Sequence, residues 1–133
     1  MRATLEISTK RNKMFSVQYK NDLDLNDLKD LTPDCHVLMA SFIEWCWNKD
    51  LPVIITSLKS DRDGIKTISN THETGRAFDA RFRAPWTQED ADQCIRYHNR
   101  LFKKIAAISY RAGKPVACDL HGDPKHFHFQ TKE

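Results

Sequence analysis

Side chains that bind metals are concentrated in two short stretches of this chain. The first, SNTHETGRAFDARF at residues 69–82, contains His72 and Asp79 seven positions apart. The second, HGDPKHFHFQ at residues 121–130, contains three of the six histidines. A catalytic zinc site uses three protein ligands and leaves one position for water or substrate. The two stretches therefore predict a metal site made of His72, Asp79 and one histidine of the C-terminal pair.

The spacing of the first two ligands indicates the local structure that holds them. Seven residues are too many for one helical turn, and they suit a loop that enters a strand. Gly75 lies between His72 and Asp79 and allows the backbone to bend there.

The C-terminal histidines alternate with phenylalanines in HFHFQ, residues 126–130. In a strand, this alternation places His126 and His128 on one face and the two phenylalanines on the other. A rise of two residues separates the imidazoles by about 7 Å, so only one of them can lie at ~2.0 Å from a zinc ion that is also bound by His72 and Asp79. Either His126 or His128 is then the third ligand.

The N-terminal half of the chain predicts a hairpin, a helix and a strand ahead of the first motif. TLEIS (4–8) and MFSVQY (14–19) alternate apolar and polar residues and are expected to pair. TPDCHVLMASFIEWCWNKD (32–50) begins with helix-starting residues, and LPVIITSL (51–58) is typical of a buried strand. The expected inner face of the helix contains Val37, Leu38, Phe42, Trp45 and Cys46.

The C-terminal half predicts one long helix and three strands. The helix is expected from an N-cap at Thr87 to a stop at Gly113, and strands are expected in GRAFDARF (75–82), PVACDL (115–120) and HFHFQ. The expected inner stripe of the helix contains Ala91, Cys94, Ile95, Leu101, Phe102, Ile105 and Ile108. The predicted fold class is α+β, with a small antiparallel sheet that carries the zinc site and packs against two main helices.

Length and composition indicate one globular domain, residues 1–133. The chain has 133 residues, 40% hydrophobic and 29% charged, which argues against disorder and fibrous structure. Its net charge of +3 is weak support for any polyanionic partner, although it suits an anionic cell-wall substrate. We expect a monomer that binds neither nucleic acid nor membrane.

Cysteine usage and the N-terminal segment bear on the cellular compartment. Cys35, Cys46, Cys94 and Cys118 form no CxxC pair, so buried reduced thiols are expected in place of disulfides or a zinc knuckle. The segment MRATLEISTKRNKMF has no apolar run long enough for a signal peptide or a membrane span. Synthesis in the cytoplasm without a signal peptide is therefore expected.

Both motifs resemble one enzyme family. HETGRAFD matches the pattern HxxGxAxD and HFH matches HxH, which are the paired signatures of the D-alanyl-D-alanine metallopeptidase superfamily. VIITSLKSDR (53–62) also resembles the family's strand ending in Thr-Ser, which a substrate-holding basic residue follows. The resemblance covers roughly residues 50–130. It implies a Zn²⁺ cofactor bound by His72 and Asp79, with Arg62 or Lys59 holding a substrate carboxylate.

The resemblance allows two assignments of the C-terminal motif. In family members with HxH the second histidine binds zinc and the first assists catalysis, which implies His128 as ligand and His126 as helper. In endolysin and dipeptidase members a carboxylate precedes the ligand by three positions, so DPKH would make His126 the ligand. We favour His128, because both imidazoles face the metal side and HFQ resembles the endolysin ending. In both assignments Asp123 is the expected catalytic base, and His126 can donate to an oxyanion.

The function implied by this resemblance is hydrolysis of peptide bonds in peptidoglycan stem peptides. A phage endolysin of L-alanyl-D-glutamate or D-Ala-D-Ala type would act on the cell wall after release by a holin. A D,D-carboxypeptidase or dipeptidase is a rival with the same chemistry. A rival of another class is a non-catalytic zinc-binding structural or interaction domain of the same fold, which would not need the carboxylate of Asp123.

Overall fold

The protein was analysed as a computed structural model that describes residues 4–8, 14–59 and 71–133. One sheet contains all six strands in the order β1-β2-β3-β4-β6-β5. The helical elements are the 3-10 helix η1 (Leu25–Asp30) and the α-helices α1 (Pro33–Lys49) and α2 (Gln88–Leu101). The strands are β1 (Thr4–Ser8), β2 (Met14–Tyr19), β3 (Val53–Ser57), β4 (Ala77–Arg81), β5 (Cys118–His121) and β6 (His126–Gln130).

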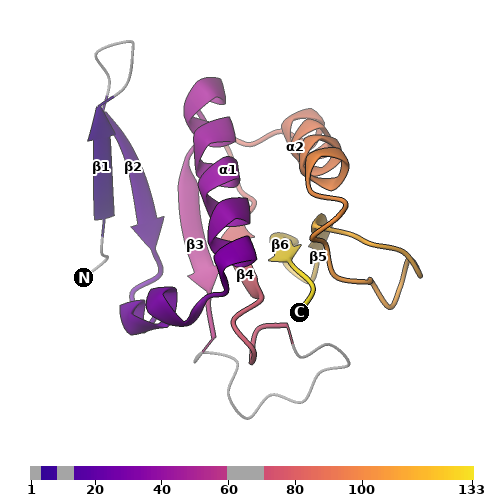
Figure 1. The fold of residues 1–133 in the computed structure, drawn as a ribbon. Helices are drawn as coiled ribbons and strands as arrows, with labels where there is room; N and C mark the ends of the chain where they lie inside the picture. Colours follow the sequence, from indigo (N-terminus) through magenta and orange to yellow (C-terminus); the bar gives the residue numbers. More distant parts are fainter. Residues whose placement is uncertain (1–3, 9–13, 60–70) are drawn as a thin grey trace.

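The α+β class with two main helices is confirmed, and so is the N-terminal hairpin of β1 and β2. The sheet is mixed, however, because β2 and β3 pair in parallel. A parallel pair needs a crossover connection, and here η1 and α1 lie between the two strands in the chain (Figure 1). The expectation of a purely antiparallel sheet was therefore wrong at this one pairing.

Helix α1 begins and ends where its sequence predicts. The Thr32 side chain accepts a hydrogen bond from the backbone N–H of Cys35 at 3.3 Å, and Asp50 closes the helix with a left-handed φ of 57°. The helix packs against β4, β6 and α2 (Figure 1). Val37 was expected on the inner face but is 53% exposed, so that assignment was wrong.

Helix α2 is shorter than its sequence pattern predicts. Thr87 and Asp90 form a capping box at its start, but the helix ends at Leu101 and does not continue to Gly113. After this end, Ala106 forms a β-bridge with Thr131 and Ile108 forms one with Pro115. Backbone hydrogen bonds to residues 114–116 nearby and to residue 132 at the C-terminal end replace helical hydrogen bonds there. Leu101 and Ile108, expected in the inner stripe, are 57% and 62% exposed, so these two assignments were wrong.

An aromatic cluster lies between α1 and the strands that carry the two motifs. The rings of Phe78 and Phe129 stack with centroids 4.6 Å apart, and Phe42 of α1 lies 4.5 Å from Phe129. Phe127 also has no exposed surface. The predicted alternation in HFHFQ is confirmed, because β6 directs its phenylalanines into this core and its histidines to the other face.

Two further expectations from composition can be compared with the structure. All four cysteines are buried and free, as predicted. Among the described residues, no helix is both long and apolar enough to cross a membrane.

Gly75 allows the backbone to turn between His72 and β4, as the sequence predicts. Its φ is +72°, and a Cβ at this position would collide with the backbone carbonyl oxygen of Asp30. The Gly75 carbonyl also accepts a hydrogen bond from the Thr32 N–H at 2.9 Å, which fixes the turn to the start of α1.

We predict that Gly75→Ala lowers the free energy of unfolding by about 2–5 kcal/mol, since left-handed strain and a backbone clash add together. Gly113→Ala is the matched control, because Gly113 also has a positive φ, +67°, but has open space around it. Strain alone should cost the control about 1–2 kcal/mol. Urea unfolding of both variants measures the difference, and equal losses would show that the close approach to Asp30 is unimportant.

Candidate metal centre

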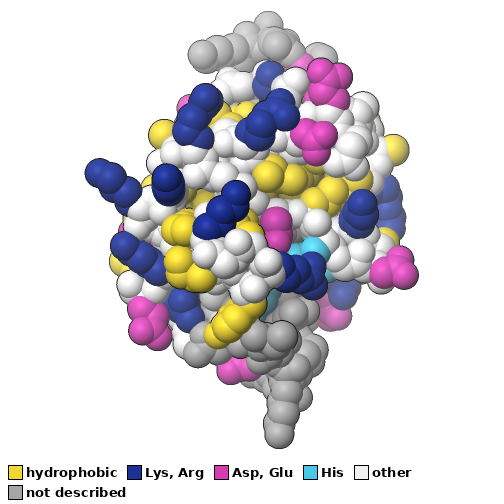
Figure 2. Space-filling view, turned by 90° about the vertical axis from the view of Figure 1, so that its right-hand side faces the viewer, with side chains coloured by type: hydrophobic (Ala, Val, Ile, Leu, Met, Phe, Trp, Pro, Cys, Tyr) yellow, Lys and Arg dark blue, Asp and Glu magenta, His cyan; other side chains and the backbone are white. Residues whose placement is uncertain are grey.

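His72, Asp79 and His128 come together on the face of the sheet opposite the aromatic cluster. One potential ligand atom from each residue lies within 4.8 Å of the others, so the group could hold a metal ion. Asp79 on β4 and His128 on β6 are direct cross-strand partners, whereas His72 comes from the turn that precedes β4. Figure 2 shows histidine side chains gathered on this part of the surface, with basic and acidic side chains beside them.

The carboxylate of Asp79 is the centre of the group. Its Oδ1 lies 2.9 Å from Nδ1 of His128 and 3.2 Å from Nε2 of His72, while its Oδ2 lies 3.5 Å from Nε2 of His126. Asp79 is only 3% exposed. Burial alone would raise its pKa, but the hydrogen bond of His128 and the charges of His72 and His128 hold the pKa of Asp79 well below its ordinary value. The carboxylate is therefore ionised and can act as a ligand.

The turn that carries His72 is fixed by backbone and side-chain hydrogen bonds. The N–H of Gly75 donates to the His72 carbonyl at 3.1 Å, and the N–H of Arg76 donates to the Thr71 carbonyl at 2.7 Å. The Arg76 guanidinium then donates to the Thr131 carbonyl at 3.1 Å, just beyond the end of β6. These bonds hold the turn against the strand that supplies His128.

The imidazole of His72 is buried, and no described residue forms a hydrogen bond with it. The side chain is 7% exposed, and both ring nitrogens are buried without a hydrogen bond to any described residue, although Nε2 lies 3.2 Å from Oδ1 of Asp79. A buried polar group without a partner is costly. A metal ion at this position would accept a lone pair of the ring and remove that cost. The residues present thus fit a bound metal.

Gln130 determines which nitrogen of His128 faces Asp79. The Gln130 amide nitrogen donates to the carbonyls of Val116 at 3.0 Å and Ala107 at 3.3 Å, so its Oε1 must point the other way. That oxygen lies 3.0 Å from Nε2 of His128 and accepts its proton. Nδ1 is then the nitrogen directed at Asp79, and its lone pair is available to a metal ion.

Without a metal, the same arrangement favours a second proton on His128. Burial lowers its pKa, but the hydrogen bond and charge of Asp79 and the acceptor Gln130 outweigh burial, and the pKa of His128 is raised above its ordinary value. A proton and a metal ion compete for Nδ1. Metal binding at this site should therefore release a proton and weaken as the pH falls.

The structure places the two C-terminal histidines in different positions relative to the group. His128 is 12% exposed and belongs to it, whereas His126 is 30% exposed and approaches the other oxygen of Asp79. This geometry agrees with His128 as the third ligand and leaves His126 beside the group. Nδ1 of His126 lies 3.3 Å from the Pro124 carbonyl.

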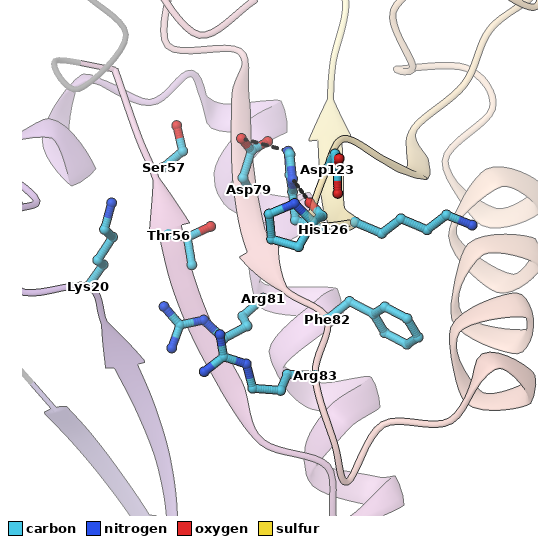
Figure 3. A pocket seen from close by; sticks show the side chains of 11 residues that line it. Lys20, Thr56, Ser57, Asp79, Arg81, Phe82, Arg83, Asp123 and His126 are labelled. Carbon is cyan, nitrogen blue, oxygen red and sulfur yellow. Dashed lines mark hydrogen bonds and ion pairs between the residues drawn. The ribbon is translucent and has the colours of Figure 1, made fainter.

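A cleft of about 460 Å³ opens next to the group (Figure 3). Asp79 and His126 point toward each other inside it, and Asp123 lies at its edge in the turn between β5 and β6. The lining residues are Lys20, Thr56, Ser57, Asp79, Arg81, Phe82, Arg83, Asp123, Pro124, Lys125 and His126.

The structure thus brings five of the predicted site residues together, and of the other two it describes only Lys59. His72, Asp79 and His128 form the group, and Asp123 and His126 line the adjoining cleft. Lys59 is half-buried and is not part of the cleft lining, and Arg62 lies outside the described residues.

The site also contains Asp119 and His121, to which the sequence analysis assigned no role. Nδ1 of His121 lies 3.1 Å from Oδ1 of Asp119, and the His121 ring lies about 5 Å from those of His126 and His128. Asp119 faces His128 in the β5–β6 ladder. Two sequence signals could have found this pair, namely the alternation of DLH, which matches that of HFH, and the place of His121 in the histidine-rich stretch 121–130.

A comparison of the chain with protein-family models, with curated proteins and with solved structures found no match. Residue chemistry and geometry therefore carry the functional proposal.

We predict that Gln130→Met weakens Zn²⁺ binding by about 10–100-fold, the usual effect of losing a partner that orients a metal-binding histidine. Titration calorimetry measures the affinity, and ¹⁵N chemical shifts of the His128 ring report whether Nε2 still carries the proton. Gln93→Met is the control, because Gln93 lies on α2, where its amide donates to Glu89 at 3.4 Å, and belongs neither to the metal group nor to the lining of the cleft. Unchanged affinity in Gln130→Met would show that Gln130 does not orient His128.

Proposed function

We propose that the protein is a zinc peptidase that hydrolyses peptide bonds of peptidoglycan stem peptides. The observation on which this rests is the buried group of His72, Asp79 and His128 beside an open cleft. The motifs HETGRAFD and HFH, which resemble those of the D-alanyl-D-alanine metallopeptidases, contain these same three residues. Motif and geometry support the same site independently.

The donor set favours zinc over other common metals. Two imidazole nitrogens and one carboxylate oxygen match a three-ligand catalytic zinc site, whereas magnesium and calcium prefer oxygen ligands alone. When bound, zinc would lower the pKa of a coordinated water toward ~7 and polarise the scissile carbonyl.

Two side chains of the cleft have the chemistry for proton transfer. The carboxylate of Asp123 is exposed at the edge of the cleft, where it can take a proton from the attacking water and later give it to the leaving amine. Nε2 of His126 lies beside Asp79 and can donate to the oxyanion of the tetrahedral intermediate. A purely structural metal site has no need of either residue.

The family resemblance supplies the substrate class and the site of action. It favours a monomeric phage endolysin, released through a holin, that cleaves L-alanyl-D-glutamate or D-Ala-D-Ala bonds of the cell wall. A non-catalytic domain of the same fold would bind the metal through the same three residues and cleave nothing.

We predict that the zinc-loaded protein releases peptide fragments from purified muropeptides, detected by mass spectrometry. Asp123→Asn and His126→Ala should retain the metal and each lose about 10²-fold or more in turnover, the scale of general acid–base catalysis. Asp92→Asn, on the exposed surface of α2, is the control and should keep full activity.

Two outcomes would contradict the proposal in different ways. Near wild-type turnover in Asp123→Asn would reject that residue as the base. A zinc-loaded wild-type protein that cleaves no muropeptide would reject the peptidase function and support the non-catalytic alternative.

A further inference from the structure

Strand β5 adds a second set of metal-binding side chains to the face of the sheet that carries the metal centre. Asp119 is the cross-strand partner of His128, and His121 is the cross-strand partner of His126. Such partners lie on the same face of a sheet. Asp119, His121 and His126 therefore form a set of one carboxylate and two imidazoles, the same composition as the first group and directly beside it.

The two imidazoles of this second set have a separation that suits a shared ion. The ring centroids of His121 and His126 lie 5.0 Å apart, compared with 5.2 Å for His72 and His128 in the first group. Two imidazoles that bind one tetrahedral ion at ~2.0 Å have centroids roughly 5 Å apart. The strands β5 and β6 thus already hold these two rings at the distance that a common ion requires.

Asp119 has a buried oxygen that lacks a hydrogen bond. Its Oδ1 forms none with any described residue, although it lies 3.1 Å from Nδ1 of His121. A buried carboxylate oxygen without a hydrogen bond is costly. A cation bound by Asp119 and His121 together would remove this cost, as we argue for His72 in the first group. The Asp119 side chain as a whole is 35% exposed, so an ion can reach it from solvent.

The ring of His126 is held between the β5–β6 turn and Asp79. Gly122 leaves the room that the ring occupies, because a Cβ at this position would collide with Cε1 and Nδ1 of His126. On the other side, Nε2 of His126 lies 3.5 Å from Oδ2 of Asp79 (Figure 3). The oxygen of Asp79 that faces away from His72 and His128 thus places negative charge beside the second set.

We propose that Asp119, His121 and His126 bind a second metal ion, Zn²⁺, more weakly than the first group does. Two imidazoles and a carboxylate favour zinc over magnesium or calcium, which prefer oxygen ligands alone. The second ion is the weaker one because its ligands are 25–35% exposed, whereas those of the first group are at most 12% exposed. Exposed side chains lose more conformational freedom on binding, and the first ion repels the second.

Occupation of the second site has a consequence for the proposed chemistry. The second ion would bind the ring of His126, which the proposed mechanism uses as the donor to the oxyanion. Zinc beyond one equivalent should therefore inhibit hydrolysis. This consequence rests on the proposed peptidase function, whereas the binding of the second ion does not.

Calorimetric titration of the metal-free full-length chain with Zn²⁺ tests the second site without any substrate. The wild type should bind two ions, the second at least about 10-fold more weakly. His121→Ala and Asp119→Asn should keep the first ion at wild-type affinity and weaken the second by about 10-fold or more, at least the loss caused by removing an orienting partner. His36→Ala, which removes an exposed histidine of α1, is the control and should bind both ions as the wild type does.

NMR of the wild type locates the second ion without relying on a variant. The ring nitrogens of His121 and His126 should shift during the second equivalent of zinc, after those of His72 and His128 have shifted during the first. One ion per chain, a second ion that His121→Ala and Asp119→Asn bind as tightly as the wild type, or unchanged His121 and His126 rings would each overturn the second site.

The second site and the proposed function can fail separately. Two bound ions in a protein that cleaves no muropeptide would support the second site and reject the peptidase function. Muropeptide cleavage by a protein that binds a single ion would do the reverse. Cleavage that continues unchanged when both ions are bound would reject the inhibition alone.

Discussion

The buried carboxylate of Asp79 is the interaction on which the site depends. Three imidazoles approach its two oxygens, at 2.9, 3.2 and 3.5 Å, in surroundings that leave the residue 3% exposed. An ionised carboxylate is stable there only while cations or hydrogen-bond donors compensate its charge. A proton shared with His128 can compensate this negative charge, and a metal ion bound by the same atoms can compensate it more completely. The centre is thus arranged for a positive charge at one defined point.

Strands β4 and β6 have one apolar face and one face that carries the metal group, and the packing of the apolar face positions the metal group. On one face Phe78 and Phe129 stack under α1, while on the other Asp79 and His128 meet as cross-strand partners. A slip of one residue between β4 and β6 would bury the histidines and expose the phenylalanines. The apolar core therefore fixes the register that the metal group requires. The Arg76 and Gly75 turn then adds His72 from outside the sheet.

Local sequence was sufficient wherever local chemistry decides the structure. The sequence predicts the two faces of β6 from the alternation of HFHFQ, the start of α1 from Thr32 and the turn before β4 from Gly75, and the structure has all three. Long-range pairing decided the rest. Ala106 pairs with the distant Thr131 where a longer α2 was expected, and the crossover through α1 makes the β2–β3 pair parallel. The register shift of β3 against β4 and the contact of Gln130 with His128 are likewise not specified by any local sequence pattern.

We expect His72, Asp79 and His128 together to bind one metal ion. Crystals grown with zinc and measured at the zinc absorption edge test this most directly, because anomalous scattering locates the ion without reference to activity. We expect a single strong anomalous-difference peak at about 2.0–2.2 Å from one atom of each of these three residues, with His126 outside bonding distance. A peak ligated by His126 in place of His128, or no peak at Asp79 at all, would contradict it.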